Sequence, residues 1–148
     1  GVDISDAALE VARSQTFPGS APGQDFRPPV FMKADVLDPE TVFDGGPFDL
    51  ILSNPPYVMD SQKAQMRPNV LENEPHLALF VPDDDPLKFY KAIAAISHEY
   101  LAEGGEGLTE INDLLGKETS EVFSAAGFSR VSLLKDLFGR NRFVSYAR

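Results

Sequence analysis

The tetrapeptide Asn54-Pro55-Pro56-Tyr57 is the segment whose residue types point most directly to chemistry. It follows the apolar run over residues 48–53, which predicts a buried strand. Adjacent prolines cannot donate backbone hydrogen bonds and each fixes its own φ angle, so the segment presents carbonyl acceptors in a stiff geometry beside the Asn54 amide. Two acceptors and an aromatic face suit a planar NH2 group. A simple turn that ends the strand explains the same residues, and the tetrapeptide alone leaves both interpretations open.

Two acidic residues follow two other predicted strands. Asp3 lies at the end of a strand over residues 1–4, and Asp35 follows a strand over residues 30–34. In nucleotide-binding α/β folds, an acidic residue after the second strand accepts hydrogen bonds from ribose hydroxyls. The Asp35 carboxylate, one strand later, is placed to accept a hydrogen bond from an adenine amino group. The structural alternatives are that Asp3 caps a helix and that Asp35 forms a turn. Together with Asn54, these residues predict three polar groups along one edge of one sheet.

Further acidic residues have weaker signals. Glu110 lies within a strand-like segment and is interpreted as orienting a loop, contacting a ligand or being merely exposed. Glu72 and Glu74 precede the run over residues 75–80, and this stretch either walls a substrate pocket or only covers a sheet edge. The run Asp83-Asp84-Asp85 lacks the alternating spacing of a calcium loop, which favours a solvated segment that caps a helix.

The elements that must position these residues alternate between strands and helices, which predicts an α/β fold with a mostly parallel sheet. The long connection over residues 58–85 shows no clear periodicity and predicts a functional loop. The C-terminal strands have a short connection around Gly139, so we expect an antiparallel pair. The remaining expected elements are a helix capped by Ser5 and ending near Gln15, a loop over 17–29, a helical turn over 39–42, a turn over 45–47, a helix from Pro86 (capped by Asp85) to Gly104-Gly105, a strand over 107–111, a helix to Ala126 closed by Gly127, and strands over 128–134 and 142–147.

Composition narrows the function classes. The 148 residues are 43% hydrophobic, enough for one packed domain, and no apolar stretch approaches the length of a membrane span. The chain has no cysteine and only two histidines, which argues against a metal site and fits a cytoplasmic location. A formal net charge of −10 argues against a nucleic acid as the main partner, since such surfaces gain affinity by neutralising phosphates.

The order of these motifs resembles the Rossmann-like S-adenosylmethionine-dependent methyltransferases that act on planar amino groups. Three further segments resemble the HemK/PrmC family within that class: Asn73-Glu74-Pro75-His76-Leu77-Ala78-Leu79, Gly104-Gly105 leading to Glu110-Ile111-Asn112, and Lys135-Asp136-Leu137-Phe138-Gly139-Arg140-Asn141-Arg142. DNA adenine and RNA guanine amino-methyltransferases share versions of the tetrapeptide alone. The resemblance to HemK/PrmC covers nearly the whole chain.

The resemblance implies a Rossmann-like class I methyltransferase sheet that is mostly parallel and ends in an antiparallel hairpin. It implies methyl transfer from S-adenosyl-L-methionine to the side-chain amide nitrogen of the glutamine in the Gly-Gly-Gln motif of class 1 peptide-chain release factors. Asn54 and the Pro55 carbonyl would hold the glutamine NH2, with Pro56, Tyr57 and Glu74 also at the substrate. Asp3, Asp35, Val36 and Asn54 would contact the cofactor. A nucleic-acid amino-methyltransferase and a non-catalytic module of the same fold are the alternatives.

The sequence departs from the family pattern at its start. Family members have an N-terminal helical domain and then a first strand with a Gly-rich cofactor loop, so residues 1–148 resemble a partial methyltransferase domain without that domain and without the first β-α unit. Gly104-Gly105-Glu106-Gly107 does not replace the loop, because it follows a predicted helix and fits a helix end and turn. We therefore expect weak or no cofactor binding and no activity from these residues alone, with strand exchange or oligomerisation as ways to cover the open sheet edges. Thr109 is polar where the family is usually apolar, so its strand is expected to be less buried.

Overall fold

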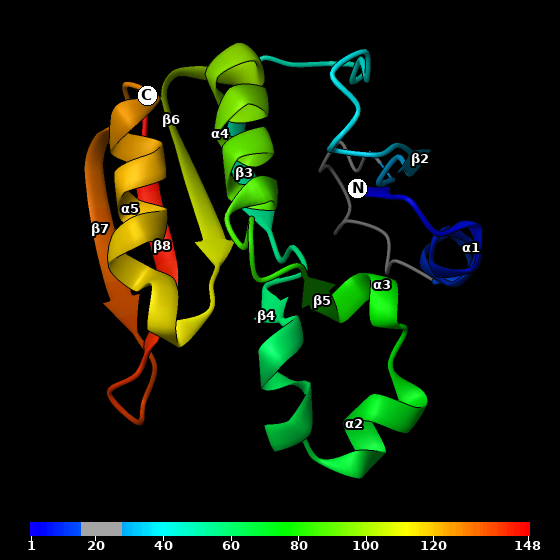
Figure 1. Cartoon of the computed structure of the whole chain (residues 1–148). Helices are drawn as coiled ribbons and strands as arrows, with labels where there is room; N and C mark the ends of the chain where they lie inside the picture. Colours follow the sequence, from blue (N-terminus) through cyan, green and yellow to red (C-terminus); the bar gives the residue numbers. More distant parts are fainter. Residues whose placement is uncertain (16–27) are drawn as a thin grey trace. The chain divides into compact units, whose positions relative to one another are not determined.

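The computed structural model describes residues 1–15 and 28–148, so most of the loop expected over 17–29 lies outside the described residues. The chain divides into two compact units, Gly1–Val42 and Phe43–Arg148, which are described separately (Figure 1). None of the helices within the described ranges is long and apolar enough to cross a membrane.

The first unit contains a short parallel strand pair and one helix. Strand β1 (Val2–Asp3) pairs with β2 (Met32–Lys33), and helix α1 (Asp6–Ser14) follows β1. The Ser5 hydroxyl accepts a hydrogen bond from Ala8 N at 3.3 Å, which satisfies one of the free amide groups at the helix start. This confirms the expected cap at Ser5. In place of the expected helical turn over 39–42, a hydrogen-bonded turn joins Thr41 N to the Asp38 carbonyl.

The second unit is built on a four-stranded mixed sheet of order β3-β6-β8-β7. β3 and β6 run parallel, whereas β6–β8 and β8–β7 are antiparallel. This confirms the α/β class and the antiparallel C-terminal pair. The strands are β3 (Phe48–Ser53), β6 (Leu101–Glu110), β7 (Ser129–Lys135) and β8 (Asn141–Ala147).

Helices α4 (Lys88–Tyr100) and α5 (Gly116–Ala125) cover one face of this sheet, as Figure 1 shows. The core between them is aromatic at its centre, where the rings of Phe123 and Tyr146 stack with centroids 4.1 Å apart. The other buried members of this cluster are Tyr90, Ile93, Ala94, Leu101, Ile111, Phe128 and Val144. The core thus anchors the strand ends from which the candidate site extends.

The expectation that β3 is a buried strand is wrong for half of its side chains. Ile51 packs against the core, but Leu50 and Leu52 are 56% and 66% exposed. Successive side chains in a strand point to opposite faces, so Leu50 and Leu52 face away from α4 and α5. Consecutive apolar residues, as at positions 50–52, are typical of a strand covered on both faces, and within the described part of this unit only one face of β3 carries helices.

The region expected to be a long loop, residues 58–85, contains regular elements as far as Val81. β4 and β5 form a short parallel pair at its two ends, and the pieces between them are helical. Each piece is too short to show a periodic pattern in sequence. The elements are β4 (Val58–Met59), the 3-10 helix η1 (Asp60–Gln65), α2 (Pro68–Asn73), α3 (His76–Leu79) and β5 (Phe80–Val81).

Two boundaries and one burial expectation also differ. Helix α4 begins at Lys88 rather than Pro86, and Asp85 instead pairs with Lys91 at 2.7 Å. Strand β6 begins at Leu101, where the helix was expected to continue to Gly104. The strand around Thr109 was expected to be less buried, yet Thr109 itself is fully buried. Its side chain points toward the helix-covered face, and its hydroxyl donates to the Glu110 carbonyl at 3.3 Å.

Candidate functional site

The tetrapeptide lies immediately beyond the carboxyl end of β3, next to the parallel strand β6. Pro55 is buried, Pro56 and Tyr57 are half-buried, and Asn54 is exposed. Pro55 and Pro56 therefore anchor the segment, while Asn54 presents its amide to solvent. Polar side chains at the carboxyl ends of parallel strands are the usual ligand-binding groups of α/β sheets.

Tyr57 is held by a chain of charged side chains. Its hydroxyl donates to Glu110 Oε1 at 2.8 Å, and Arg142 Nη1 donates to the same oxygen at 3.2 Å. The other end of the guanidinium donates from Nη2 to Asp136 Oδ2 at 3.4 Å. One arginine on β8 thus bridges a carboxylate at the end of β6 and a carboxylate at the β7–β8 turn. The partly buried Glu110 acts as an orienting group, which was one of the interpretations of the sequence.

This environment keeps Tyr57 protonated. Burial raises the pKa of the Tyr57 phenol to about 12, and both the hydrogen bond to Glu110 and its negative charge act in the same direction. The Arg142 charge opposes them. Burial likewise raises the pKa of Tyr90 above its ordinary value. Tyr57 is therefore a hydrogen-bond donor and an aromatic surface at neutral pH, and it is not suited to act as a base.

Asn112 clamps the end of the tetrapeptide from below the surface. It is 3% exposed, and its amide nitrogen donates to the Tyr57 carbonyl at 2.8 Å and to Gln62 Oε1 at 2.7 Å. Its side-chain oxygen accepts from Leu114 N at 3.1 Å. Gln62 Oε1 also accepts from Met59 N, so one buried amide joins the tetrapeptide to η1.

A cavity of about 270 Å³ opens beside Tyr57. Its polar lining includes groups from three separate parts of the chain: η1, the segment after β6, and the β7–β8 hairpin. These donors and acceptors can hydrogen-bond a polar group placed in the cavity. The lining residues are Tyr57, Val58, Gln62, Gln65, Met66, Ile111, Asn112, Asp113, Arg140 and Arg142.

Ser53 adds an unsatisfied polar group just before the tetrapeptide. Its hydroxyl is buried and has no hydrogen-bond partner among the residues that the structure describes. A buried hydroxyl without a partner costs free energy, so such groups mark positions where water or a ligand completes the bonding. A serine at the end of an apolar strand carries no signal in the sequence for such a role.

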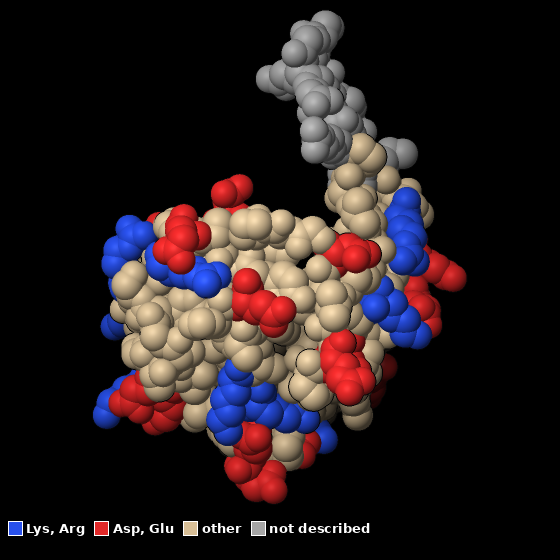
Figure 2. All heavy atoms as spheres, turned by 90° about the horizontal axis from the view of Figure 1, so that it is seen from above, with Lys and Arg blue, Asp and Glu red and all other residues tan. Residues whose placement is uncertain are grey.

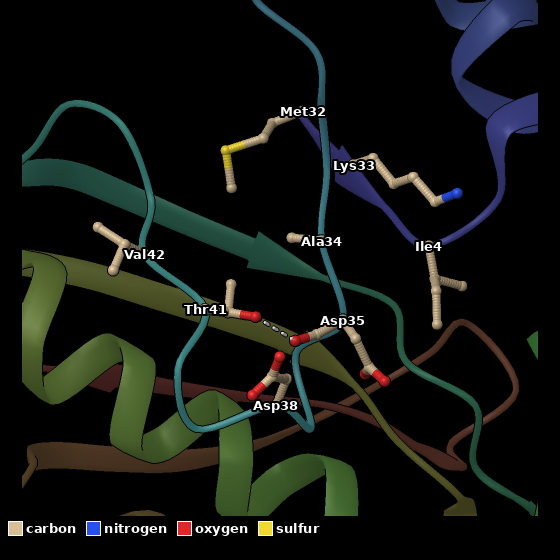
Figure 3. Close-up of a pocket in the computed structure, with 8 residues that line it drawn as sticks. All are labelled: Ile4, Met32, Lys33, Ala34, Asp35, Asp38, Thr41 and Val42. Carbon is tan, nitrogen blue, oxygen red and sulfur yellow. Dashed lines mark hydrogen bonds between the residues drawn. The ribbon is translucent and has the colours of Figure 1, made fainter.

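A separate cavity of about 450 Å³ lies within the first unit around Asp35 (Figure 3). The Thr41 hydroxyl donates to the Asp35 carbonyl at 2.8 Å, and Asp35 Oδ1 accepts from Leu37 N at 2.9 Å. This second bond is the turn expected as the structural alternative for Asp35. It leaves acceptor capacity on the carboxylate, because an ionised carboxylate has about four lone-pair sites. The other lining residues are Ile4, Met32, Lys33, Ala34, Asp38 and Val42.

The remaining candidate cofactor residues have less direct geometry. Asp3 Oδ1 accepts from Ser5 N at 2.8 Å and so leads the chain into α1. Val36 is half-buried and is not among the described residues lining the cavity around Asp35. Strands β1 and β2 form a two-stranded sheet of their own in the first unit, whereas β3 belongs to the four-stranded sheet of the second unit. The described strands therefore do not place Asp3, Asp35 and Asn54 on one sheet, and their meeting at one site stays a prediction.

Glu74 lies at the C-terminal end of α2 and is exposed. Neither of the two cavities described above includes it among its lining residues. Its proposed role at the substrate stays a prediction.

On the face drawn in Figure 2, basic and acidic side chains are interspersed over the described residues.

The structural roles of Arg142, Asn112 and Gln62 were not predicted from the sequence. In the sequence Arg142 appears only as the last residue of a segment that resembles the family, whereas in the structure its guanidinium is partly buried between two carboxylates. Asn112 appeared only as a member of a motif. The signal that was available is that both residues fall in segments that resemble the family, together with Glu110 and Asp136.

Nearly the whole chain is similar in sequence to curated bacterial proteins. The release factor glutamine methyltransferase of Bacteroides thetaiotaomicron is 38% identical over 146 residues, covering 99% of this chain and 50% of that protein. The protein of the same name from Flavobacterium psychrophilum is 38% identical over 143 residues, covering 97% of this chain and 47% of that protein. The chain is homologous to the release factor glutamine methyltransferases. It spans about half the length of the curated relatives it matches.

No family model matches the chain. A solved structure described as that of a possible exported protein from Bordetella parapertussis aligns with 100% of this chain and 52% of that chain, with a TM-score of 0.50 and 16% identity. At this identity the likeness concerns the fold alone. The sequence-based resemblance is thus confirmed by the glutamine methyltransferase relatives over almost every residue of the chain.

Proposed function

We propose that the protein containing this chain transfers a methyl group from S-adenosyl-L-methionine to the side-chain amide nitrogen of the glutamine in the Gly-Gly-Gln motif of peptide-chain release factors. The observation that carries the proposal is the exposed Asn54 amide at the carboxyl end of β3, followed by residues that are anchored through Tyr57 and Asn112. Homology to release factor glutamine methyltransferases supports the substrate class. A cytoplasmic location belongs to this proposal.

The chemistry requires an amide nitrogen to act as a nucleophile. Its lone pair is delocalised into the carbonyl, so the nitrogen is weak until its geometry is fixed. In this proposal, Asn54 Oδ1 and the Pro55 carbonyl accept hydrogen bonds from the two N–H groups of the glutamine. These bonds aim the nitrogen at the methyl group and favour lone-pair density on it.

Atoms and charge balance without a strong base on the protein. When bound, S-adenosyl-L-methionine would supply the methyl group to the nitrogen and would depart as a neutral thioether. The nitrogen then loses one proton to water, because the alkylated amide is strongly acidic until that proton leaves. Tyr57 stays neutral throughout and contributes its ring as a wall of the site.

The cofactor supplies an already activated methyl group, and the first unit has groups that fit its nucleoside. The cavity around Asp35 combines apolar side chains such as Ile4 and Met32 with carboxylate acceptors. Apolar side chains suit the faces of a purine ring, and an acceptor suits its exocyclic amino group. We assign Asp35 and Val36 to the adenine and Asp3 to the ribose hydroxyls, with Asn54 beside the transferred methyl group.

Methyl transfer to a purified release factor tests the proposal. Mass spectrometry of the digested product is expected to place one methyl group on the Gly-Gly-Gln glutamine. Asn54→Ala is expected to lower kcat/KM by at least 100-fold, since it removes an acceptor used only when the nitrogen is aligned. Asn69→Ala, on the exposed surface of α2, is the matched control and should retain activity within about twofold. Methyl transfer to DNA or RNA instead of the release factor would refute the assignment.

A further inference from the structure

The turn between β7 and β8 exposes two large apolar side chains. Leu137 is 102% exposed and Phe138 is 88% exposed, and they are adjacent at the tip of the hairpin. Single exposed leucines are common on protein surfaces, but adjacent apolar side chains fully in water at one projecting turn are a feature of binding surfaces.

The turn is held in one conformation. Asp136 Oδ1 accepts from Phe138 N at 2.8 Å and from Arg140 N at 3.0 Å. The Asp136 backbone also bonds across the turn, with its N–H donating to the Arg140 carbonyl at 2.8 Å. Gly139 adopts a φ of +79°, which its lack of a side chain allows. Leu137 and Phe138 are therefore presented on an ordered backbone, which lowers the entropy cost of binding through them.

The same turn adjoins the proposed glutamine site. Arg140 contributes to the cavity beside Tyr57, and Asp136 binds Arg142, which in turn binds Glu110. Figure 1 shows the turn at the end of the sheet where β3 and β6 also end. One carboxylate, that of Asp136, thus shapes the exposed tip with one oxygen and bonds with the other to the arginine that supports the Tyr57 network.

We propose that the β7–β8 turn is a docking element for the folded release factor. The side chains of Leu137 and Phe138 insert into an apolar depression on the release factor, next to the loop that carries the target glutamine. The inference rests on the proposed function and deepens it. Continuity with the cavity argues for this occupant: a glutamine bound beside Tyr57 brings the surface around its loop toward the turn. Aromatic side chains that become buried at the centre of a contact are typical anchors of protein interfaces.

The proposal separates two kinds of substrate. A short peptide around Gly-Gly-Gln fills only the cavity, so it does not use the turn. A whole release factor uses both. The double substitution Leu137→Ser and Phe138→Ser removes the anchors and leaves Asp136, Arg140 and the backbone hydrogen bonds of the turn in place.

The test uses the protein that contains this chain, with whole release factor and a short Gly-Gly-Gln peptide as substrates. The double variant is expected to raise KM for the whole release factor at least tenfold, with kcat unchanged and with peptide methylation within twofold of the parent. Equilibrium binding of release factor, measured by anisotropy without turnover, is expected to weaken by the same factor. Val11→Ser, at a 62% exposed position on α1, is the matched control. It should leave kcat and KM unchanged for both the whole release factor and the peptide.

Each other result overturns the proposal in a distinguishable way. Equal losses with peptide and whole protein would show that the turn acts only by supporting the cavity. Unchanged KM and unchanged binding would show that the tip is not part of the interface. Loss of self-association on sedimentation, without a change in binding of the release factor, would assign the tip to a second copy of the chain. If the parent protein methylates neither substrate but the double variant still binds release factor more weakly, the proposed function fails and the docking surface stands.

Discussion

Tyr57 and Glu110 are 53 residues apart in sequence, yet the phenolic hydroxyl of one donates to the carboxylate of the other at 2.8 Å. The bond joins the segment after β3 to the end of the neighbouring parallel strand β6. Because Arg142 binds the same carboxylate oxygen, the position of the Tyr57 ring depends on three strands of the sheet. The candidate site is therefore rigid at the residue that ends the tetrapeptide.

This pair predicts a change in the titration of Tyr57. Glu110→Gln removes a negative charge and a charged acceptor, both of which raise the Tyr57 pKa, so the pKa is expected to fall from about 12 toward the ordinary value of 10. It should stay above 10, because burial is the largest cause of the shift. The raised pKa favours the neutral form in the folded state. Its contribution to stability is thus fully present below pH 10 and is lost as the pH rises toward 12.

Ultraviolet titration of tyrosinate absorbance measures this shift. Subtraction of the Tyr57→Phe titration from that of the parent isolates the Tyr57 step, and the same subtraction is made with Glu110→Gln. An unchanged midpoint in the Glu110→Gln protein would show that the carboxylate does not act on the phenol in solution.

The buried amide of Asn112 predicts a graded loss of stability. Asn112→Ala leaves the Tyr57 carbonyl and the Leu114 N–H without their partner and is expected to cost about 2–4 kcal/mol in the free energy of unfolding. Asn112→Asp should be at least as damaging, because it directs an anionic oxygen at two acceptors. Denaturant unfolding gives both values.

The control for Asn112 is Asn73→Ala on the exposed end of α2, whose side chain makes one local bond to the Asn69 carbonyl. It is expected to cost less than about 0.5 kcal/mol. If Asn112→Asp proved as stable as the parent protein, the side chain of Asn112 would not be donating to the Tyr57 carbonyl and to Gln62 Oε1 in solution.

Gly107 predicts a steric effect beneath the site. A Cβ atom at this position would overlap the ring of the buried Tyr146 and lie 2.5 Å from its hydroxyl oxygen. Gly107→Ala is therefore expected to destabilise the fold by about 1–3 kcal/mol. In a Tyr146→Leu background the ring is gone, so the same substitution should cost clearly less. A double-mutant cycle of denaturant unfolding measures that coupling, and additive effects would contradict the predicted clash.

The sequence was sufficient for the features that depend on local pattern. Alternation of strands and helices predicted the α/β class, and the apolar run over residues 48–53 located the strand that ends at Ser53, immediately before Asn54. The antiparallel C-terminal pair followed from a short connection between two strands. These features are encoded by neighbouring residues, so no knowledge of the rest of the fold is needed.

Features that depend on distant residues were not predictable in the same way. An arginine in a hairpin is ordinarily solvated. Only the fold places Arg142 between Glu110 and Asp136. The elements between Val58 and Val81 are too short to show a periodic pattern in the sequence. Helices of this length depend on packing against the rest of the fold. Leu50 and Leu52 have the same apolar character as Ile51, and their exposure depends on which sheet face the helices cover.

Asp35 predicts a selective loss of cofactor affinity. In the protein that contains this chain, Asp35→Ala removes the proposed acceptor for the adenine amino group, so the Kd for S-adenosyl-L-methionine is expected to rise at least tenfold by calorimetry. Part of any effect would come from loss of the Leu37 N–H bond, and Asp35→Asn resolves this because its side-chain oxygen keeps an acceptor for that bond. Glu40→Gln, at a nearby exposed position, is the control and should bind within about twofold of the parent. Equal affinities of the parent and Asp35→Ala proteins would remove Asp35 from the cofactor site and leave its turn-forming hydrogen bond as its role.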